Sequence, residues 1–199
     1  PALAADTTPP TITPPVSKFA VGSTGTSSSP IRITWTSADD WTGVSQHRLQ
    51  QSVDGAAWTN VGLSSATATS ATRTVALGHS YRYRTRAADV AGNWSAWMYG
   101  PTFTFRIYQQ TSGNIAYTGT WYSQSIAGAS GGSSKYSNTP PGRAKFTISA
   151  RSIAWVGMTC SYCGMAPVYV DGVYKTSVNT QWGTVNGQHS GPRVMYARS

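Results

Sequence analysis

Apolar and polar side chains alternate along much of this chain, a pattern typical of half-buried β-strands. Residues 31–35 (IRITW) and 144–148 (AKFTI) show this alternation. Because successive side chains of a strand point to opposite faces, we expect Ile31, Ile33 and Trp35 to face a hydrophobic core. The pattern predicts an all-β protein.

A central alternating run spans residues 80–89 and leads into residues 94–97 (WSAW). The inward face of this predicted strand is uncharged and holds Tyr81, Tyr83, Thr85 and Ala87. The outward face holds a row of three arginines, Arg82, Arg84 and Arg86. Residues 89–93 (DVAGN) supply turn-forming side chains, so WSAW is predicted to open the next strand.

Two more segments complete the first half. Residues 44–53 are predicted to form a strand whose one face carries His47, Leu49, Gln51 and Val53. Asp54-Gly55 then supplies a turn. Residues 5–16 hold two Pro-Pro pairs and indicate a lead-in to an edge strand, because proline has no N–H to donate.

These segments resemble a fibronectin type III domain over residues 6–107. Trp35, residues 44–58, residues 75–81 (VALGHSY) and residues 80–97 carry the resemblance. It implies an immunoglobulin-like β-sandwich in which the Tyr81 hydroxyl bonds to the backbone upstream, as a tyrosine corner.

The WSAW element is similar to the Trp-Ser-x-Trp-Ser element of cytokine receptors, which share this fold. That similarity implies a structural ladder in which Arg82, Arg84 and Arg86 interleave with Trp94 and Trp97. Each guanidinium over an indole ring would contribute about 0.5–1 kcal/mol. The alternative is an exposed strip of aromatic and basic groups that binds sugar rings or nucleic acid.

The second half also alternates in short runs. Strands are expected over residues 115–122, 144–148, 153–156, 168–170, 173–176 and 193–196. Asp171-Gly172 lies between two apolar runs and predicts a tight hairpin. Trp155 is expected to lie in the core because its neighbours alternate.

Residues 117–121 (YTGTW), 153–157 (IAWVG) and 164–174 (GMAPVYVDGVY) resemble a galactose-binding-like β-sandwich module of bacterial secreted and surface proteins. The resemblance implies a jelly-roll sandwich over residues 112–199 that lacks its last strand and exposes an edge. The predicted organisation is a lead-in over residues 1–10, a first sandwich over 11–108 and a second over 109–199.

The charge of the chain is strongly positive. Fifteen Lys and Arg residues face six acids, giving a net charge of +9, and all six acids are aspartates. Such a charge permits attraction to nucleic acid, anionic cell-wall polymers or acidic glycans. Glycosidases generally use two carboxylates, whereas these aspartates stand mostly in predicted turns. We therefore expect no catalytic residue, no metal and no cofactor.

Cys160 and Cys163 are the only cysteines. The absence of a following helix and of further ligands disfavours redox and zinc chemistry, although both remain alternatives, as do free thiols. A disulfide between Cys160 and Cys163, formed in an oxidising compartment, is favoured. Ala2-Leu3-Ala4 fits either a signal-peptidase site or a linker.

Two functions are compatible with these features. The first is a non-catalytic structural or adhesive module pair of a bacterial surface or secreted assembly, joined head to tail through residues 5–16 into filaments. The second is a carbohydrate-binding accessory region of a secreted hydrolase, with aromatic contacts from Trp121, Tyr122, Tyr162 and Trp182. Expected partners are another copy, another surface protein or glycans. Nucleic acid is disfavoured by secretion, and no stretch approaches the ~20 apolar residues of a membrane helix.

Overall fold

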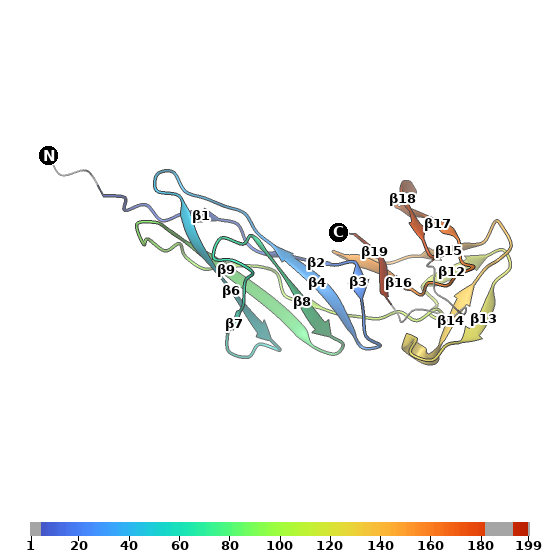
Figure 1. Cartoon of the computed structure of the whole chain (residues 1–199). Helices are drawn as coiled ribbons and strands as arrows, with labels where there is room; N and C mark the ends of the chain where they lie inside the picture. Colours follow the sequence, from blue (N-terminus) through green and yellow to red (C-terminus); the bar gives the residue numbers. More distant parts are fainter. Residues whose placement is uncertain (1–4, 182–192, 199) are drawn as a thin grey trace. The chain divides into compact units, whose positions relative to one another are not determined.

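The computed structural model describes residues 5–181 and 193–198 (Figure 1). Every regular element in this part of the chain is a strand, apart from one short 3-10 helix, η1 (Ser130–Gly132). The all-β prediction is confirmed. No helix among the described residues is long and apolar enough to cross a membrane.

The chain divides into two compact units. Unit 1 comprises Pro1–Lys18 and Ile31–Arg106, and unit 2 comprises Phe19–Pro30 and Ile107–Ser199. The segment Phe19–Pro30 thus groups with the C-terminal residues, an arrangement that no local pattern in the sequence indicates. Residues 1–4, which include Ala2-Leu3-Ala4, lie outside the described part.

Unit 1 is built around two sheets. The larger has the order β10-β9-β6-β7, with β11 also paired to β9, and the other has the order β2-β4-β8. A third sheet consists of the two short strands β1 and β5. The strands are β1 (Thr11–Ile12), β2 (Val16–Phe19), β4 (Ser28–Thr34), β5 (Ser37–Ala38), β6 (Val44–Val53), β7 (Thr59–Val61), β8 (Ser70–Ala76), β9 (Ser80–Asp89), β10 (Met98–Tyr99) and β11 (Phe103–Thr104). The last residue of β2 and the first three of β4 are counted with unit 2.

The predicted inward faces of unit 1 form its core. Ile31, Ile33 and Trp35 are all buried, as are Leu49 of β6 and Tyr83 of β9. The central strands β6 and β9 pair over nearly their whole length, so these side chains are fixed in register. On the predicted inward face of β6, Gln51 and Val53 are only half-buried, because that end of the strand approaches the Asp54-Gly55 turn.

One strand boundary in unit 1 differs from the prediction. The WSAW segment does not form a strand: only Trp94 makes an isolated bridge, to Ala88, and β10 begins at Met98. Asp89 explains the delay, because its carboxylate accepts hydrogen bonds from the backbone and side-chain amides of Asn93, each at 2.8 Å. These bonds hold the chain in a loop before it can pair again.

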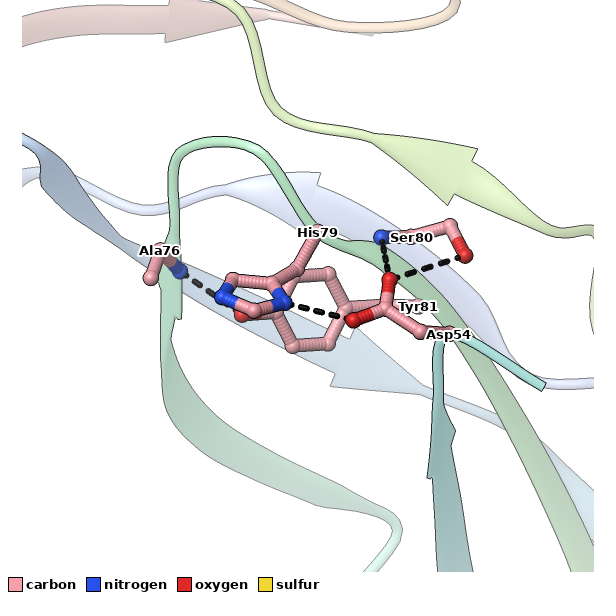
Figure 2. A network of polar contacts seen from close by, with 5 residues as sticks. All are labelled: Asp54, Ala76, His79, Ser80 and Tyr81. Atoms are coloured by element: carbon pink, nitrogen blue, oxygen red, sulfur yellow. Dashed lines mark hydrogen bonds and ion pairs between the residues drawn. The ribbon is translucent and has the colours of Figure 1, made fainter. Parts of the chain in front are cut away.

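The tyrosine corner is confirmed. The backbone N–H of Ala76 donates to the Tyr81 hydroxyl at 2.8 Å, and Figure 2 shows this bond beside a second network. There Asp54, at the turn after β6, accepts from the Ser80 backbone N–H at 2.7 Å and lies 2.6 Å from His79 Nδ1. The two networks tie the loop before β9 to the end of β6.

Unit 2 contains smaller sheets. They are the pairs β12-β15, β13-β14 and β17-β18 and a three-stranded sheet of order β16-β19-β3. The strands are β3 (Gly22–Ser23), β12 (Ile115–Thr118), β13 (Tyr122–Ser125), β14 (Ser133–Tyr136), β15 (Arg143–Phe146), β16 (Ile153–Gly157), β17 (Met165–Val170), β18 (Val173–Asn179) and β19 (Arg193–Arg198).

The predicted strand over residues 115–122 is divided in two. Gly119 has a φ of 83°, a left-handed conformation that side chains rarely adopt, and a Cβ there would lie 2.6 Å from the Pro141 carbonyl oxygen. The chain therefore turns between β12 and β13. The Asp171-Gly172 hairpin is confirmed, since Asp171 and Gly172 both have positive φ between the paired strands β17 and β18.

The strand expected over residues 193–196 is present and has neighbours on both sides. β19 pairs with β16, and its residues Arg193 and Val194 also pair with β3. This strand is thus the middle strand of its sheet, and the missing last strand of the second sandwich stays a prediction. At the N-terminal side, Thr11 and Ile12 pair with β5.

Candidate functional site

The outer face of the β6-β9 sheet carries stacked arginine and aromatic side chains. Arg84 and Arg86 both lie over Trp97, at 4.4 and 4.6 Å from guanidinium carbon to ring centroid. Arg86 also lies 4.4 Å from the Trp94 centroid. Arg82, by contrast, contacts Tyr99 at 5.0 Å and is not among the arginines that contact a tryptophan.

Three residues of this array were not predicted from the sequence to belong to it. Arg48 lies 4.5 Å over Trp94, Trp58 lies 4.4 Å from Arg84, and Tyr99 contacts both Arg82 and Arg84. The alternation in β6 places Arg48 on the face opposite Leu49, which is a usable signal. Its partner strand, however, is more than thirty residues away in sequence. We call Arg48, Arg82, Arg84 and Arg86 the arginine ladder.

Hydrogen bonds hold one end of the arginine ladder. The Nε and Nη2 groups of Arg84 donate to Gln50 Oε1 at 2.8 and 2.6 Å, and its Nη1 donates to the Tyr99 hydroxyl at 3.1 Å. Arg82 Nε donates to the Gly100 carbonyl at 3.1 Å. These bonds and stacked rings tie β9 to β10 and β6 without any ligand.

Unit 2 displays an exposed aromatic pair on its β13-β14 hairpin. Tyr122 and Tyr136 are directly opposite in register, with ring centroids 5.5 Å apart and planes inclined by 30°. They are 45% and 41% exposed. We call Tyr122 and Tyr136 the tyrosine pair.

Polar groups accompany the tyrosine pair on the same face. Side chains two residues along a strand share a face, so Gln124 and Ser134, also paired in register, lie beside the tyrosines. The Gln124 amide donates to the Ser134 hydroxyl at 3.4 Å. An aromatic surface with an adjacent amide and hydroxyl can stack on a sugar ring and hydrogen-bond its hydroxyls.

The other face of this hairpin packs against unit 2 itself. Ser133 Oγ accepts from the Gln110 amide at 2.6 Å, and Lys135 Nζ lies 4.5 Å from the Tyr117 ring centroid. Burial raises the pKa of Tyr117, whose hydroxyl donates to the Gln110 carbonyl at 2.9 Å. The hairpin is thus anchored by one face, and the tyrosine pair lies on the other.

The other predicted sugar contacts are placed as follows. Trp121 is half-buried, donates its indole N–H to the Thr118 carbonyl at 3.0 Å and lies edge-on to Tyr117, with 5.0 Å between ring centroids. Tyr162 is 74% exposed and lies in the loop between Cys160 and Cys163. Trp182 falls outside the described residues. Trp155, which we expected in the core, is 38% exposed.

Cys160 and Cys163 form a disulfide in the structure. Cys160 is buried, and its backbone N–H donates to the Thr180 carbonyl at 3.2 Å. The bridge closes a short loop and fixes it beside the end of β18. Disulfides persist in oxidising compartments, so this bond suggests that the chain resides in one.

All six aspartates lie in the described part, and three of them gather at one end of unit 1. Asp6, Asp39 and Asp89 place a carboxylate oxygen each within 4.8 Å of one another. The hydroxyl of Thr42 donates to Asp6 at 2.6 Å, and this bond, first among the causes, lowers the Asp6 pKa. The Gly43 backbone N–H donates to Asp39 at 2.8 Å. The oxygens are suited to a hard cation, and their hydrogen bonds already join three loops.

The remaining aspartates occupy turns or the surface. Asp54 bonds His79 and Ser80, and the bond from His79 lowers the Asp54 pKa more than any other contact. Asp171 adopts positive φ in its hairpin, and Asp40 is exposed. Hydrogen bonds or a turn conformation therefore account for five of the six aspartates, and Asp40 is the exception.

No protein-family model matches this chain. Two enzymes of the bacterium Flavonifractor plautii resemble parts of it. The chain is 32% identical over 79 residues to an A type blood alpha-D-galactosamine galactosaminidase, which covers 40% of the chain and 7% of the enzyme. It is 30% identical over 92 residues to an A type blood N-acetyl-alpha-D-galactosamine deacetylase, covering 45% of the chain and 12% of the enzyme. The matched regions are thus small parts of large carbohydrate-acting enzymes.

Proposed function

We propose that this chain is a non-catalytic, carbohydrate-binding accessory region of a larger secreted bacterial carbohydrate-active enzyme. The observation that carries the proposal is the exposed tyrosine pair on an anchored hairpin, with Gln124 and Ser134 beside it. The resemblance to fibronectin type III and galactose-binding-like modules, which accompany such enzymes, agrees with it.

The names of the two similar enzymes suggest which glycan the chain binds. One acts on galactosamine and the other on N-acetyl-galactosamine, both in A type blood structures. An accessory region serves such an enzyme by holding it on the same glycan. We therefore propose glycans that end in galactosamine or N-acetylgalactosamine as the ligands of the tyrosine pair.

The carboxylates support a binding role over a catalytic one. Hydrolysis of a glycosidic bond generally needs two carboxyl groups flanking the bond, about 5–9.5 Å apart. Asp6, Asp39 and Asp89 form one cluster, in which Asp6 and Asp89 are buried. Their carboxylate oxygens accept hydrogen bonds from surrounding loops. Asp54 and Asp171 belong to turns on different units.

Calorimetric titration of the full chain with an A type blood oligosaccharide tests the proposal. We expect the affinity to fall at least about 10-fold in the double variant Tyr122→Ser/Tyr136→Ser, since a nucleobase stacked on one aromatic ring gains roughly 1–3 kcal/mol and this variant removes two rings. A second titration with the galactosamine-terminated analogue distinguishes the two ligand forms.

The chain offers a matched control. Tyr169 and Tyr174 are also opposed across a hairpin and exposed, but their rings meet edge to face, with planes inclined by 68°. The variant Tyr169→Ser/Tyr174→Ser should bind within about 2-fold of the parent chain, because this pair offers no near-parallel rings. No binding by the parent chain, or equal losses in both variants, would refute the proposal.

A further inference from the structure

Two arginines of the arginine ladder have no polar partner. Arg48 and Arg86 are directly opposite in the register of β6 and β9. Both contact the Trp94 ring, but neither donates a hydrogen bond to any described residue, and the Nε of Arg86 is buried without an acceptor. Arg84, two residues along, has donors bound to Gln50 and Tyr99. Arg48 and Arg86, at one end of the ladder, are thus the two members with no donor in a hydrogen bond to a described residue, whereas Arg82 and Arg84 each have at least one.

The charges of this pair are not balanced by acids. The ion pair found in the described part of the chain joins His79 to Asp54, so none of the ladder arginines has a carboxylate within 4.0 Å there. Like charges directly opposite on neighbouring strands destabilise a sheet. Burial lowers the pKa of Arg86, and the positive charges of Arg48 and Arg84 lower it further. An anion at this position would relieve the repulsion.

The stacked rings restrict what such an anion can be attached to. Trp94 is covered by Arg48 and Arg86, and Trp97 by Arg84 and Arg86. Ring faces occupied by guanidinium groups are poor stacking surfaces for nucleobases, which single-stranded nucleic acids need for much of their affinity. What the pair offers is a set of N–H donors for anionic oxygens.

We propose that Arg48 and Arg86 form a binding site for the anionic groups, carboxylate or sulfate, of an acidic glycan. A guanidinium presents its donors as a planar fork that matches both groups. The flanking Trp94 fixes both guanidinium groups, so little side-chain entropy is lost on binding. This site lies in unit 1 and uses no residue of the tyrosine pair.

Affinity measurements with four probes test this site. The probes are oligomers of polygalacturonate, which carry only carboxylates, oligomers of sulfated dextran, neutral dextran and a single-stranded oligonucleotide. The parent chain should bind one or both acidic glycans and not neutral dextran. The variant Arg48→Gln/Arg86→Gln should lose about 10-fold or more in affinity, because hydrogen bonds to charged groups are strong.

A control variant removes the same charge from elsewhere in unit 1. Arg32 of β4 and Arg73 of β8 are exposed on the other sheet. Arg32→Gln/Arg73→Gln should lose about 3-fold or less, through reduced long-range attraction alone. Equal losses in the two double variants would overturn the proposal, because the net charge alone would then explain binding.

Two further results separate the site from its alternatives. Arg48→Lys/Arg86→Lys keeps the charge but removes the fork, so we expect its affinity for the acidic glycan to fall by about 3-fold or more. Parent-level affinity in this folded variant would overturn the proposal, and the Lys variant also decides the matter if the Gln variant fails to fold. Tighter binding of the oligonucleotide than of either acidic glycan, lost in the same variants, would overturn the assignment to a glycan.

Discussion

The two units differ in where most of their tyrosines lie. In unit 1, Trp35, Tyr81 and Tyr83 are at most 7% exposed and form the core. In unit 2, Tyr122, Tyr136, Tyr169 and Tyr174 are each at least 41% exposed. These aromatic side chains form the core of unit 1, whereas the four tyrosines of unit 2 lie on its surface. Trp41 and Tyr99 of unit 1 are exposed as well, at 60% and 43%.

Strand length explains the difference. β6 and β9 are ten residues each and pair across a common core, so alternate aromatic residues are enclosed. Three sheets of unit 2 are two-stranded hairpins or pairs, which have too little area to enclose both faces. Buried apolar side chains described in unit 2 are few and include Ile126, Val178 and Val194. Unit 1 thus has the larger enclosed core, and unit 2 leaves more of its tyrosines on the surface.

The largest expected effect tests the core of unit 1. Leu49 is 1% exposed, so Leu49→Ala should lower the free energy of unfolding by about 2–5 kcal/mol through lost burial and the cavity left behind. Val173 of unit 2 is 56% exposed, and Val173→Ala should change it by about 0.5 kcal/mol or less. Urea unfolding measures both, and similar effects would contradict the contrast between the units.

The next effect concerns how unit 2 is held. Replacing both cysteines by serine opens the short loop between Cys160 and Cys163. The loop-entropy relation gives a loss of about 2 kcal/mol for so short a loop. Thermal unfolding with and without reductant should show the same decrease in the parent chain. An unchanged transition in both experiments would mean that the bridge adds nothing to a unit with so small a core.

The next prediction concerns the hydrogen bond of the tyrosine corner in unit 1. Tyr81→Phe keeps the ring but removes the acceptor for the Ala76 N–H, which should cost about 1–2 kcal/mol. The Ala76 amide should then exchange its hydrogen faster. Tyr108→Phe, at an exposed ring of unit 2, serves as the control. Unaltered exchange at Ala76 would show that the corner is dispensable.

The smallest effect is a dependence on pH. Burial lowers the pKa of His47 in the folded chain, whereas the unfolded chain keeps an ordinary histidine pKa of about 6.5. The unfolded state therefore binds a proton first, and stability falls as the pH drops from 7.5 to 5.5. His47→Gln should flatten this dependence in urea titrations, and an equally steep one would exclude His47 as its source.

Strands and tight turns could be predicted from the sequence because they depend on residues close together in the chain. The alternation in residues 31–35 and in β9 and the Asp171-Gly172 hairpin follow from spacing and turn chemistry. The bond from the upstream backbone to the Tyr81 hydroxyl was expected from the resemblance to fibronectin type III domains. The break between β12 and β13 at Gly119 was not predicted. The left-handed backbone of Gly119 goes with the close approach of Pro141, which is distant in sequence.

Side chains that meet through pairing could not be found in the same way. Arg48 joins the arginine ladder only because β6 pairs with β9 in one register, and Tyr136 reaches Tyr122 only through the register of β13 and β14. Each of these contacts depends on strand pairing that a single sequence does not specify. The candidate binding surfaces are therefore the part that sequence reasoning reached least well.

The central claim is that the tyrosines of unit 2, and not those of unit 1, receive the glycan. Fluorine NMR of the full chain labelled with 3-fluorotyrosine tests it directly, with resonances assigned by Tyr122→Phe and Tyr136→Phe. On addition of the oligosaccharide probe, the resonances of Tyr122 and Tyr136 should shift, while those of buried Tyr81 and Tyr83 stay in place. Unshifted Tyr122 and Tyr136 resonances at a saturating concentration of the probe would contradict the account.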